Sequence, residues 1–355
     1  ELCGTEIVIP PSFNQWDKVA RIAKKQSVLA LVGNAMLAQP AISDDLSLEL
    51  KTKIKSFIVS NMYMHQQLNH LLLKAKAALE GKKIVPVLLK GQGVASNYPN
   101  PLLRQCGDVD FYIGEERYED AYEVFKEIAS KIDDKSDIYK GKHFHAFIGK
   151  IEFDVHRFCG KYSLKSYDRR FQEESLKGLT KDFEELDVHN VVVYAPAREY
   201  NAYYIFNHIL NHFQVSGIGL RHLCDLMMFL HANYGKLDLN ELKRILDRMG
   251  VMYPWKLFGG VLVNVLGMPA YEFPFYENIS RWKIDNVIRH ILDEGNFGFG
   301  TNYYSYVSKQ GLSRYYHSIK FHTVRFLRLF TMMPKASLRR MCNYLAFGFS
   351  CIWNR

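Results

Sequence analysis

Two carboxylates stand one residue apart in Gly107-Asp108-Val109-Asp110-Phe111-Tyr112-Ile113, and an apolar run follows them. Because side chains alternate along a strand, Asp108 and Asp110 would point to the same face. Divalent cations such as Mg²⁺ are held in proteins by a few carboxylates together with substrate phosphates. The stretch therefore predicts a buried strand that carries half of a phosphate-handling metal site, although two solvated turn acids would give the same local pattern.

A β-branched and leucine-rich run precedes this strand and ends in a turn: Ile84-Val85-Pro86-Val87-Leu88-Leu89-Lys90-Gly91-Gln92-Gly93. It predicts a buried strand and then a turn in which Gly91 and Gly93 let backbone N–H groups approach a ligand. A short helix over residues 94–97 would direct its positive end to that turn, which favours phosphate. Arg104 follows; its planar guanidinium suits phosphate oxygens, and a surface salt bridge is the alternative.

Downstream, residues 143–148 and 150–158 flank a Gly149-Lys150 turn and predict a β-hairpin. In its second strand Glu152, Asp154 and His156 share one face, while the apolar residues share the other. A third carboxylate from a neighbouring strand is what metal-dependent nucleotidyl transfer requires, because it binds a metal ion and takes the proton of the attacking hydroxyl.

The order of these motifs resembles that of the nucleotidyltransferase superfamily with the DNA polymerase β-type catalytic core: Lys-Gly, Tyr-Pro-x-Pro, Arg, Gly-Asp-Val-Asp and Asp-x-His. Within it, the chain is similar to the bacterial family described as uncharacterised nucleotidyltransferases. The motifs span residues 84–158. A looser resemblance continues through Phe206-Asn207-His208, His212, Arg221 and Asp225-Leu226.

The resemblance implies roles for seven residues. They are the catalytic and metal-binding carboxylates Asp108, Asp110 and Asp154, and the triphosphate-binding residues Lys90, Gly91, Gly93 and Arg104. Glu152 competes with Asp154 for the third carboxylate position, and His156 fits the pattern without a firm role. The turn departs from most members of the wider superfamily, because Gln92 stands between the glycines and the serine that would touch a terminal phosphate is absent. The details of triphosphate binding therefore stay open.

The implied function is metal-dependent nucleotidyl transfer. With Mg²⁺ or Mn²⁺ as cofactor, an NMP group would move from ATP or another NTP to an acceptor hydroxyl, and pyrophosphate would leave. The acceptor stays open among a small molecule, a peptide, a protein side chain and an RNA end, because one activated hydroxyl suits them all. Two other functions stay open: an inactive nucleotide-binding or regulatory protein on the same fold, and a nucleic-acid-binding protein that uses the basic C-terminal region.

Composition and length indicate a folded protein of two or three domains. The chain has 355 residues, of which 48% are hydrophobic and 23% charged. We expect no signal peptide, because residues 1–4 are neither basic nor an apolar run, and no apolar run approaches the roughly 20 residues of a membrane span. The six cysteines lack CxxC spacing, so we expect neither a zinc knuckle nor a disulfide framework, and a cytoplasmic location. The sequence predicts no oligomeric state.

Three regions are expected, together forming an α+β fold: a nucleotidyltransferase-type mixed sheet core flanked by N-terminal helices and a larger C-terminal helical region. Residues 1–80 form the N-terminal helical region, residues 81–195 the core, and residues 196–355 the C-terminal helical region with a basic tail. Apolar spacing predicts helices over residues 16–31 and 46–79. Further expected elements are a helix over residues 116–131, a strand over residues 190–194 and a helix from Pro196.

Two features of the C-terminal region have alternative interpretations. His208 and His212 share one helix face, where zinc would need a third ligand and where hydrogen bonding is the plainer role. Arg221 and Asp225 have the same spacing and could pair, or their helix could pack over the nucleotide site.

The end of the chain is basic. No Asp or Glu follows Glu294, and the Lys and Arg residues beyond it are Lys309, Arg314, Lys320, Arg325, Arg328, Lys335, Arg339, Arg340 and Arg355. Aromatic residues are interleaved with them. This pattern is compatible with binding to RNA, a membrane surface or an acidic protein, and equally with a helical subdomain whose aromatics are buried and whose arginines are solvated or face acids elsewhere.

Overall fold

The computed structural model describes residues 9–10, 12–133, 141–188, 190–298 and 311–353. The chain divides into two compact units. The sheet unit comprises residues 56–162 and 167–201, and the helical unit comprises residues 1–55, 163–166 and 202–355. The boundaries at residues 80 and 195 that the sequence suggested stay a prediction.

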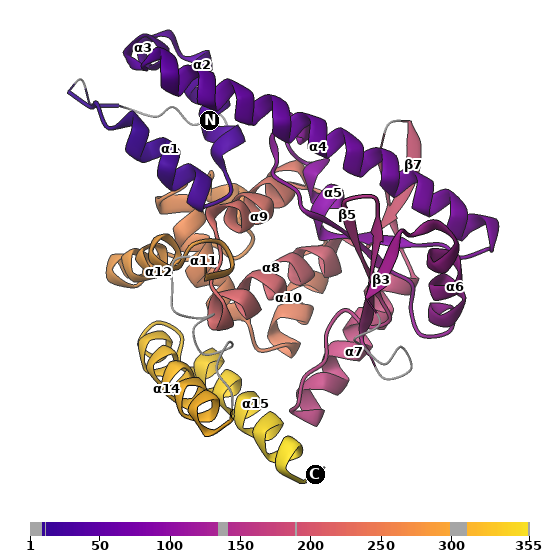
Figure 1. Cartoon of the computed structure of the whole chain (residues 1–355). Helices are drawn as coiled ribbons and strands as arrows, with labels where there is room; N and C mark the ends of the chain where they lie inside the picture. Colours follow the sequence, from indigo (N-terminus) through magenta and orange to yellow (C-terminus); the bar gives the residue numbers. More distant parts are fainter. Residues whose placement is uncertain (1–8, 11, 134–140, 189, 299–310, 354–355) are drawn as a thin grey trace. The chain divides into compact units, whose positions relative to one another are not determined.

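One mixed sheet forms the centre of the sheet unit (Figure 1). Among the described residues its order is β3-β4-β5-β2-β1-β7-β6. The strands are β1 Val87–Leu89, β2 Asp108–Tyr112, β3 Lys131–Asp133, β4 His143–Ile148, β5 Ile151–His156, β6 Glu184–Val188 and β7 Val191–Ala195. Strand β2 pairs antiparallel with β1 and parallel with β5. The predicted α+β class with a mixed sheet core and the predicted hairpin are confirmed.

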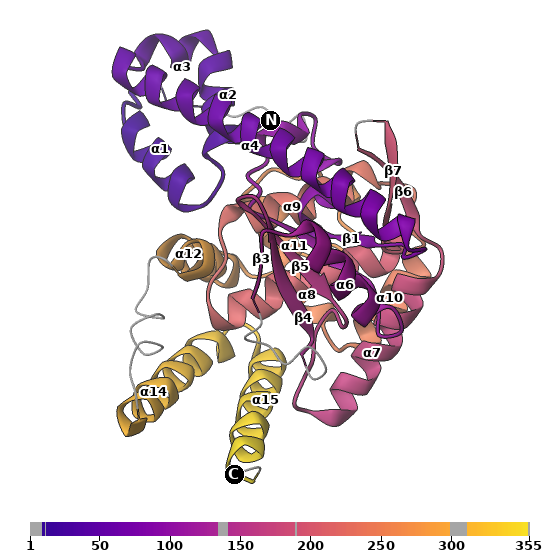
Figure 2. The same cartoon turned by 45° about the vertical axis from the view of Figure 1, so that its right-hand side comes forward.

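Alternation gives this sheet one apolar and one polar face. The buried rings Phe111, Phe144 and Phe153 come from three neighbouring strands and belong to one core cluster. Helix α6 (Tyr118–Ile128) lies against this sheet (Figure 2). Its Phe125 ring lies 5.6 Å, between ring centroids, from both Phe144 and Phe153. Apolar residues of helix α4 (Leu48–Gly81) join the cluster. Since each buried aromatic stabilises the fold by about 1.5–3 kcal/mol, this face is fixed as the inner one.

The remaining helices of the sheet unit are short or peripheral. They are α5 Lys90–Ala95, the 3₁₀ turn η1 Pro101–Leu103, α7 Lys165–Thr180 and the beginning of α8, Arg198–Val215. The helix expected over residues 94–97 is wrong in position, because α5 begins at Lys90 directly after β1. The helix expected from Pro196 begins at Arg198. Strands β3 and β6 were not predicted, since they are short edge strands of mixed polarity.

The helical unit is built around aromatic residues. Its elements are α1 Trp16–Lys25, α2 Leu29–Ala38, α3 Pro40–Asp45, the first part of α4, most of α8, α9 Leu220–Ala232, α10 Leu239–Arg248, α11 Met252–Asn264, η2 Ala270–Glu272, α12 Arg281–Glu294, η3 Asn296–Gly298, α14 Gly311–Phe330 and α15 Pro334–Trp353. Phe206 packs edge-on against Trp255 and Phe258, with ring centroids 5.2 and 5.7 Å away. No helix in the described part of the chain is long and apolar enough to cross a membrane.

The single helix expected over residues 16–31 is wrong. It breaks between α1 and α2, where Ser27 has a left-handed φ of 57°. Tertiary hydrogen bonds explain the break. The fully buried Gln26 donates from Nε2 to the carbonyl of Ile291 at 3.2 Å and accepts at Oε1 from the backbone N–H of Leu220 at 3.0 Å. Apolar spacing cannot reveal contacts between residues so far apart in sequence.

Part of the basic C-terminal region is used internally. The buried Arg325 binds both carboxylate oxygens of Glu294 at 2.7 Å, and Arg328 lies 3.3 Å from Asp293. Arg339 donates to the carbonyl of Met249 at 2.6 Å. Lys309 and Arg355 lie outside the described residues.

Close packing of α7 against Tyr200 gives a test of the sheet unit. A Cβ atom at Gly178 would lie 2.2–2.6 Å from atoms of the Tyr200 side chain, whose hydroxyl is held by Ser175 at 2.7 Å. We expect Gly178→Ala to lower the free energy of unfolding by about 1–3 kcal/mol. Gly81 is the matched control, because a Cβ there meets nothing within 4 Å. Gly81→Ala should be neutral or slightly stabilising in urea unfolding, and equal losses in the two variants would contradict this packing.

Candidate functional site

The polar face of the sheet gathers the acidic residues that the sequence singled out. In the parallel pairing of β2 with β5, Asp108 lies opposite Glu152 and Asp110 opposite Asp154. One potential ligand atom from each of Asp110, Asp154 and His156 lies within 4.8 Å of the other two. Two adjacent strands therefore bring two carboxylates and one imidazole together.

Asp110 is the buried centre of this group. Its side chain is 2% exposed, and its Oδ1 lies 2.9 Å from Lys90 Nζ and 2.9 Å from His156 Nε2. Burial alone would raise the pKa of Asp110, but the charge of Lys90 and the hydrogen bond from His156 hold that pKa well below its usual range. Asp110 is thus ionised at neutral pH.

Asp154 behaves differently. Burial raises the pKa of this carboxyl, and the neighbouring negative charge of Asp110 raises it further. Asp154 therefore accepts a proton more readily than its partner. Two carboxylates on one face with pKa values moved in opposite directions suit one fixed negative charge and one proton acceptor.

Lys90 is held at the site by an unusual backbone. It has a φ of 31° and is followed by Gly91 at φ 43°, ψ −117°, both outside the helical region. A Cβ at Gly91 would lie 3.4 Å from the backbone oxygen of Asp108, so this turn approaches the start of β2 closely. Burial lowers the pKa of Lys90, but the charges of Asp110 and Asp108 outweigh it and raise that pKa above its usual value. Backbone strain of this kind is concentrated at functional sites.

Two histidines of this face received no role from the sequence. His143 and His145 lie on β4, with His143 Nε2 3.0 Å from His145 Nε2. His145 Nδ1 lies 2.5 Å from Asp154 Oδ1. Burial, with the charges of His156 and Lys142, lowers the pKa of His143 to about 3. The alternation that placed Asp154 and His156 on one face of the hairpin would have found them, had it been carried to the first strand.

The other predicted residues have more local surroundings. Asp108 is half-buried, two residues before Asp110 on the same face. Arg104 is 4% exposed and donates to Cys106 Sγ at 3.0 Å, so a phosphate would have to replace or join local contacts. A Cβ at Gly93 would lie 3.5 Å from the carbonyl oxygen of Leu88. Gln92 is buried and donates to Asn69 Oδ1 at 3.2 Å.

The turn itself does not form the expected helix end. Helix α5 has six residues and is kinked at Gly91. Since peptide dipoles add along a helix, so short a helix contributes little to phosphate binding.

The family described as "Uncharacterised nucleotidyltransferase" matches residues 12–259, which is more than half of the chain. The chain belongs to this family. Comparison with proteins of curated function gives no significant match. The crystal structure of an antigenic nucleotidyltransferase-like protein from Paracoccidioides brasiliensis is 13% identical and covers 60% of this chain and 94% of its own, with a TM-score of 0.34. At this TM-score and sequence identity, we infer nothing about this chain from the similarity.

A larger hollow of this nucleotidyltransferase-family chain lies within the sheet unit. Its volume is about 570 Å³, a size that suits a small molecule. Tyr112, Arg157 and Cys159 line it together with residues of α7 such as Gln172 and Ser175. Tyr112 is two residues beyond Asp110 on the same face of β2, so the hollow lies near the ends of the strands that carry the carboxylates.

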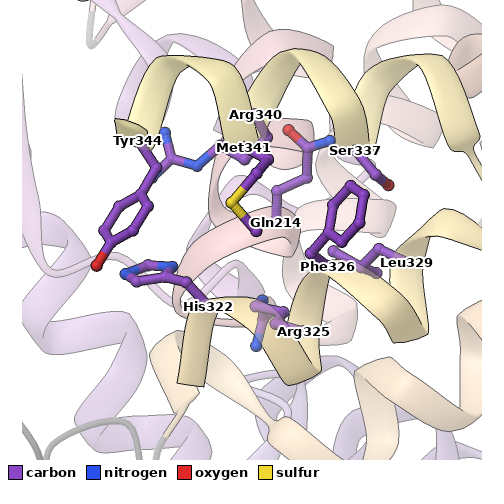
Figure 3. A pocket seen from close by; sticks show the side chains of 9 residues that line it. All are labelled: Gln214, His322, Arg325, Phe326, Leu329, Ser337, Arg340, Met341 and Tyr344. Atoms are coloured by element: carbon purple, nitrogen blue, oxygen red, sulfur yellow. The ribbon is translucent and has the colours of Figure 1, made fainter. Parts of the chain in front are cut away.

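A smaller hollow lies in the helical unit, between α8, α14 and α15 (Figure 3). Its volume is about 20 Å³, room for roughly one water molecule. Its Arg325 already binds Glu294. We assign it no ligand.

The histidines of α8 give no metal site in the described part of the chain. His208 and His212 have ring centroids 4.4 Å apart, and His222 of α9 stacks on His208 at 5.9 Å. The groups of potential metal ligands lie on the sheet instead. His212 Nδ1 lies 3.0 Å from Ser216 Oγ, which agrees with the hydrogen-bonding interpretation.

Replacing Lys90 tests the electrostatics of the site. Lys90→Met leaves Asp110 buried with His156 as its remaining partner in this contact, so we expect the free energy of unfolding at pH 7 to fall by up to about 3 kcal/mol. A depressed carboxyl pKa contributes stability above the unfolded value of about 4, and this contribution is lost as the pH falls through the folded value. The difference in free energy of unfolding between the native protein and Lys90→Met should therefore shrink below about pH 4.

The control is Lys126→Met, which removes an exposed pair with Glu123 and should change stability by less than about 0.5 kcal/mol. Urea unfolding across a pH series measures both variants. A loss for Lys90→Met that did not depend on pH would contradict the pairing with Asp110.

Proposed function

We propose that this member of the family is a metal-dependent nucleotidyltransferase that moves an NMP group from an NTP to an acceptor hydroxyl and releases pyrophosphate. We place it with the DNA polymerase β-type superfamily. The observation that carries the proposal is the convergence of Asp110, Asp154 and His156 within 4.8 Å on adjacent strands. Family membership supports this reaction class, and the acidic group on the sheet is of the kind that the reaction needs.

The donor set suits a divalent cation. Clustered carboxylates repel each other, as the raised pKa of Asp154 reflects, and a metal ion relieves that repulsion. Asp108, Asp110 and Asp154 would hold Mg²⁺ or Mn²⁺. A divalent ion held there would supply polarisation of the α-phosphate and stabilisation of the charge on the leaving pyrophosphate.

The residues of the chain have separate tasks in this proposal. Asp154 accepts the proton of the attacking hydroxyl at a carboxylate oxygen, and its raised pKa makes it the better base of the two. His156 orients Asp110 through its hydrogen bond. Lys90 binds the triphosphate, for which its ammonium must leave or share its pairing with Asp110. Gly91 lets the triphosphate approach the backbone. Gly93 and Arg104 also bind the triphosphate in this proposal.

The hollow of about 570 Å³ is our proposed place for a small acceptor. Ser175 and Gln172 offer polar groups, while Phe158 and Leu179 offer apolar surface. The lining also carries charged side chains, among them Glu115 and Arg157, and a pocket of this size can hold a drug-sized molecule. A peptide or protein acceptor would present only its hydroxyl-bearing side chain there.

A second candidate is a nucleotide-binding protein without turnover. Gln92 replaces the serine of the phosphate turn, and its amide is turned to Asn69. Such a protein would bind NTP and transfer nothing.

Thermal unfolding with each of the four NTPs, with and without Mg²⁺, tests the nucleotide site. A ligand that binds only the folded state raises the melting temperature by mass action. At a ligand concentration 100 times the dissociation constant, the folded state gains about 2.7 kcal/mol of stability. We expect a Mg²⁺-dependent rise for the native protein with at least one NTP. The rise should vanish in Asp108→Asn, because the variant loses a proposed metal ligand.

Asp120→Asn is the matched control, since Asp120 is 60% exposed and pairs only with Arg117 among its described ion-pair partners. It should keep the full response to nucleotide. An equal response in Asp108→Asn and the native protein would contradict the metal assignment, and no response to any NTP in a folded native protein would contradict the nucleotide site.

A further inference from the structure

A pair of histidines lies beside the proposed nucleotide site and has no task in it. His143 and His145 are two residues apart on β4, so alternation sends both rings to the polar face of the sheet. In the antiparallel pairing of β4 with β5, His145 lies opposite Asp154. One hairpin therefore brings two nitrogen donors and one carboxylate together without the help of a loop.

The spacing of these donors is close to that around a metal ion. The Nε2 atoms of His143 and His145 lie 3.0 Å apart. Two nitrogens bound at about 2.0–2.1 Å to one tetrahedral ion lie about 3.3 Å apart. One potential ligand atom from each of His143, His145 and Asp154 lies within 4.8 Å of the other two. To join both histidines on one ion, the Asp154 carboxylate, whose Oδ1 lies against His145 Nδ1, would turn toward the two Nε2 atoms.

The other ring nitrogen of His145 lies beside two carboxylates. Its Nδ1 lies 3.0 Å from Glu152 Oε1 and 2.5 Å from Asp154 Oδ1. Metal-ligating imidazoles commonly donate their second N–H to a carboxylate, which fixes the tautomer and directs the lone pair of the other nitrogen to the metal. A proton on Nδ1 of His145 would leave the lone pair on Nε2, which faces His143. Two such nitrogens at 3.0 Å need a proton or a cation between them.

We propose that His143, His145 and Asp154 bind one divalent transition-metal ion such as Zn²⁺ or Co²⁺. Imidazole nitrogen suits these ions, whereas Mg²⁺ prefers oxygen ligands. The histidine site shares Asp154 with the proposed nucleotide site and requires neither nucleotide nor transfer in order to bind its ion. The competing explanation is a hydrogen bond between the two imidazoles, which keeps a proton between them and binds no metal.

Cobalt binding to the full chain tests the histidine site. The chelator-treated protein is titrated with Co²⁺ in excess Mg²⁺, which occupies oxygen-rich sites, and the visible absorption of bound Co²⁺ reports its ligands. We expect one ion per chain. The double variant His143→Gln/His145→Gln should bind at least about 100-fold more weakly, since loss of an orienting partner alone costs about 10–100-fold.

Two further variants keep the test decisive. His70→Gln removes an exposed histidine of α4 in the same unit and should leave Co²⁺ binding unchanged. Glu152→Gln removes only the orienting carboxylate, which is 41% exposed, and should weaken binding about tenfold. Circular dichroism without metal checks that each variant is folded.

The outcomes for the two sites are distinguishable. Asp108→Asn should keep Co²⁺ binding although it loses the response to NTP. Absence of bound Co²⁺ in the native chain, or equal affinity in the double variant, would overturn the histidine site whatever the nucleotide experiments show.

Discussion

The parallel pairing of β2 with β5 is the constraint on which the sheet unit depends. It sets Asp110 opposite Asp154 and Phe111 opposite Val155 in one register. Because side chains alternate, a shift of one residue would move the carboxylates under α4 and α6 and expose the aromatic rings. The hydrophobic core and the acidic group are therefore specified by the same hydrogen-bond register, and neither can change alone.

This pairing also creates an electrostatic problem that the neighbouring residues solve. The buried Asp110 and the partly buried Asp154 on adjacent strands repel each other. Lys90 and His156 neutralise Asp110, while Asp154 keeps a raised pKa. The ammonium of Lys90 is brought there by a left-handed backbone at the end of β1. A non-glycine residue in that conformation is strained, and the favourable contact with Asp110 helps to offset the strain.

The sequence predicted what depends on local alternation and failed where distant contacts decide. Strand β2, the hairpin of β4 and β5 and the shared face of Asp154 and His156 follow from apolar and polar residues in alternation. The break at Ser27 could not be predicted, because it depends on Gln26 and its partners 194 and 265 residues away, at Leu220 and Ile291. Nor could the pairing of Lys90 with Asp110 be predicted, since the family resemblance implied only a triphosphate contact for Lys90. The roles of the seven site residues stay predictions.

The fate of labelled phosphate tests the central proposal most directly. The native protein is incubated with Mg²⁺, a pool of hydroxyl compounds and peptides, and the NTP that stabilises it, labelled at either the α- or the γ-phosphorus. Nucleotidyl transfer predicts that the α-label enters a product and that the γ-label leaves in pyrophosphate. The Asp108→Asn variant should show neither incorporation of the α-label nor release of the γ-label, whereas the Asp120→Asn variant should show both. Entry of the γ-label into product, or undiminished α-label transfer by Asp108→Asn, would contradict the account.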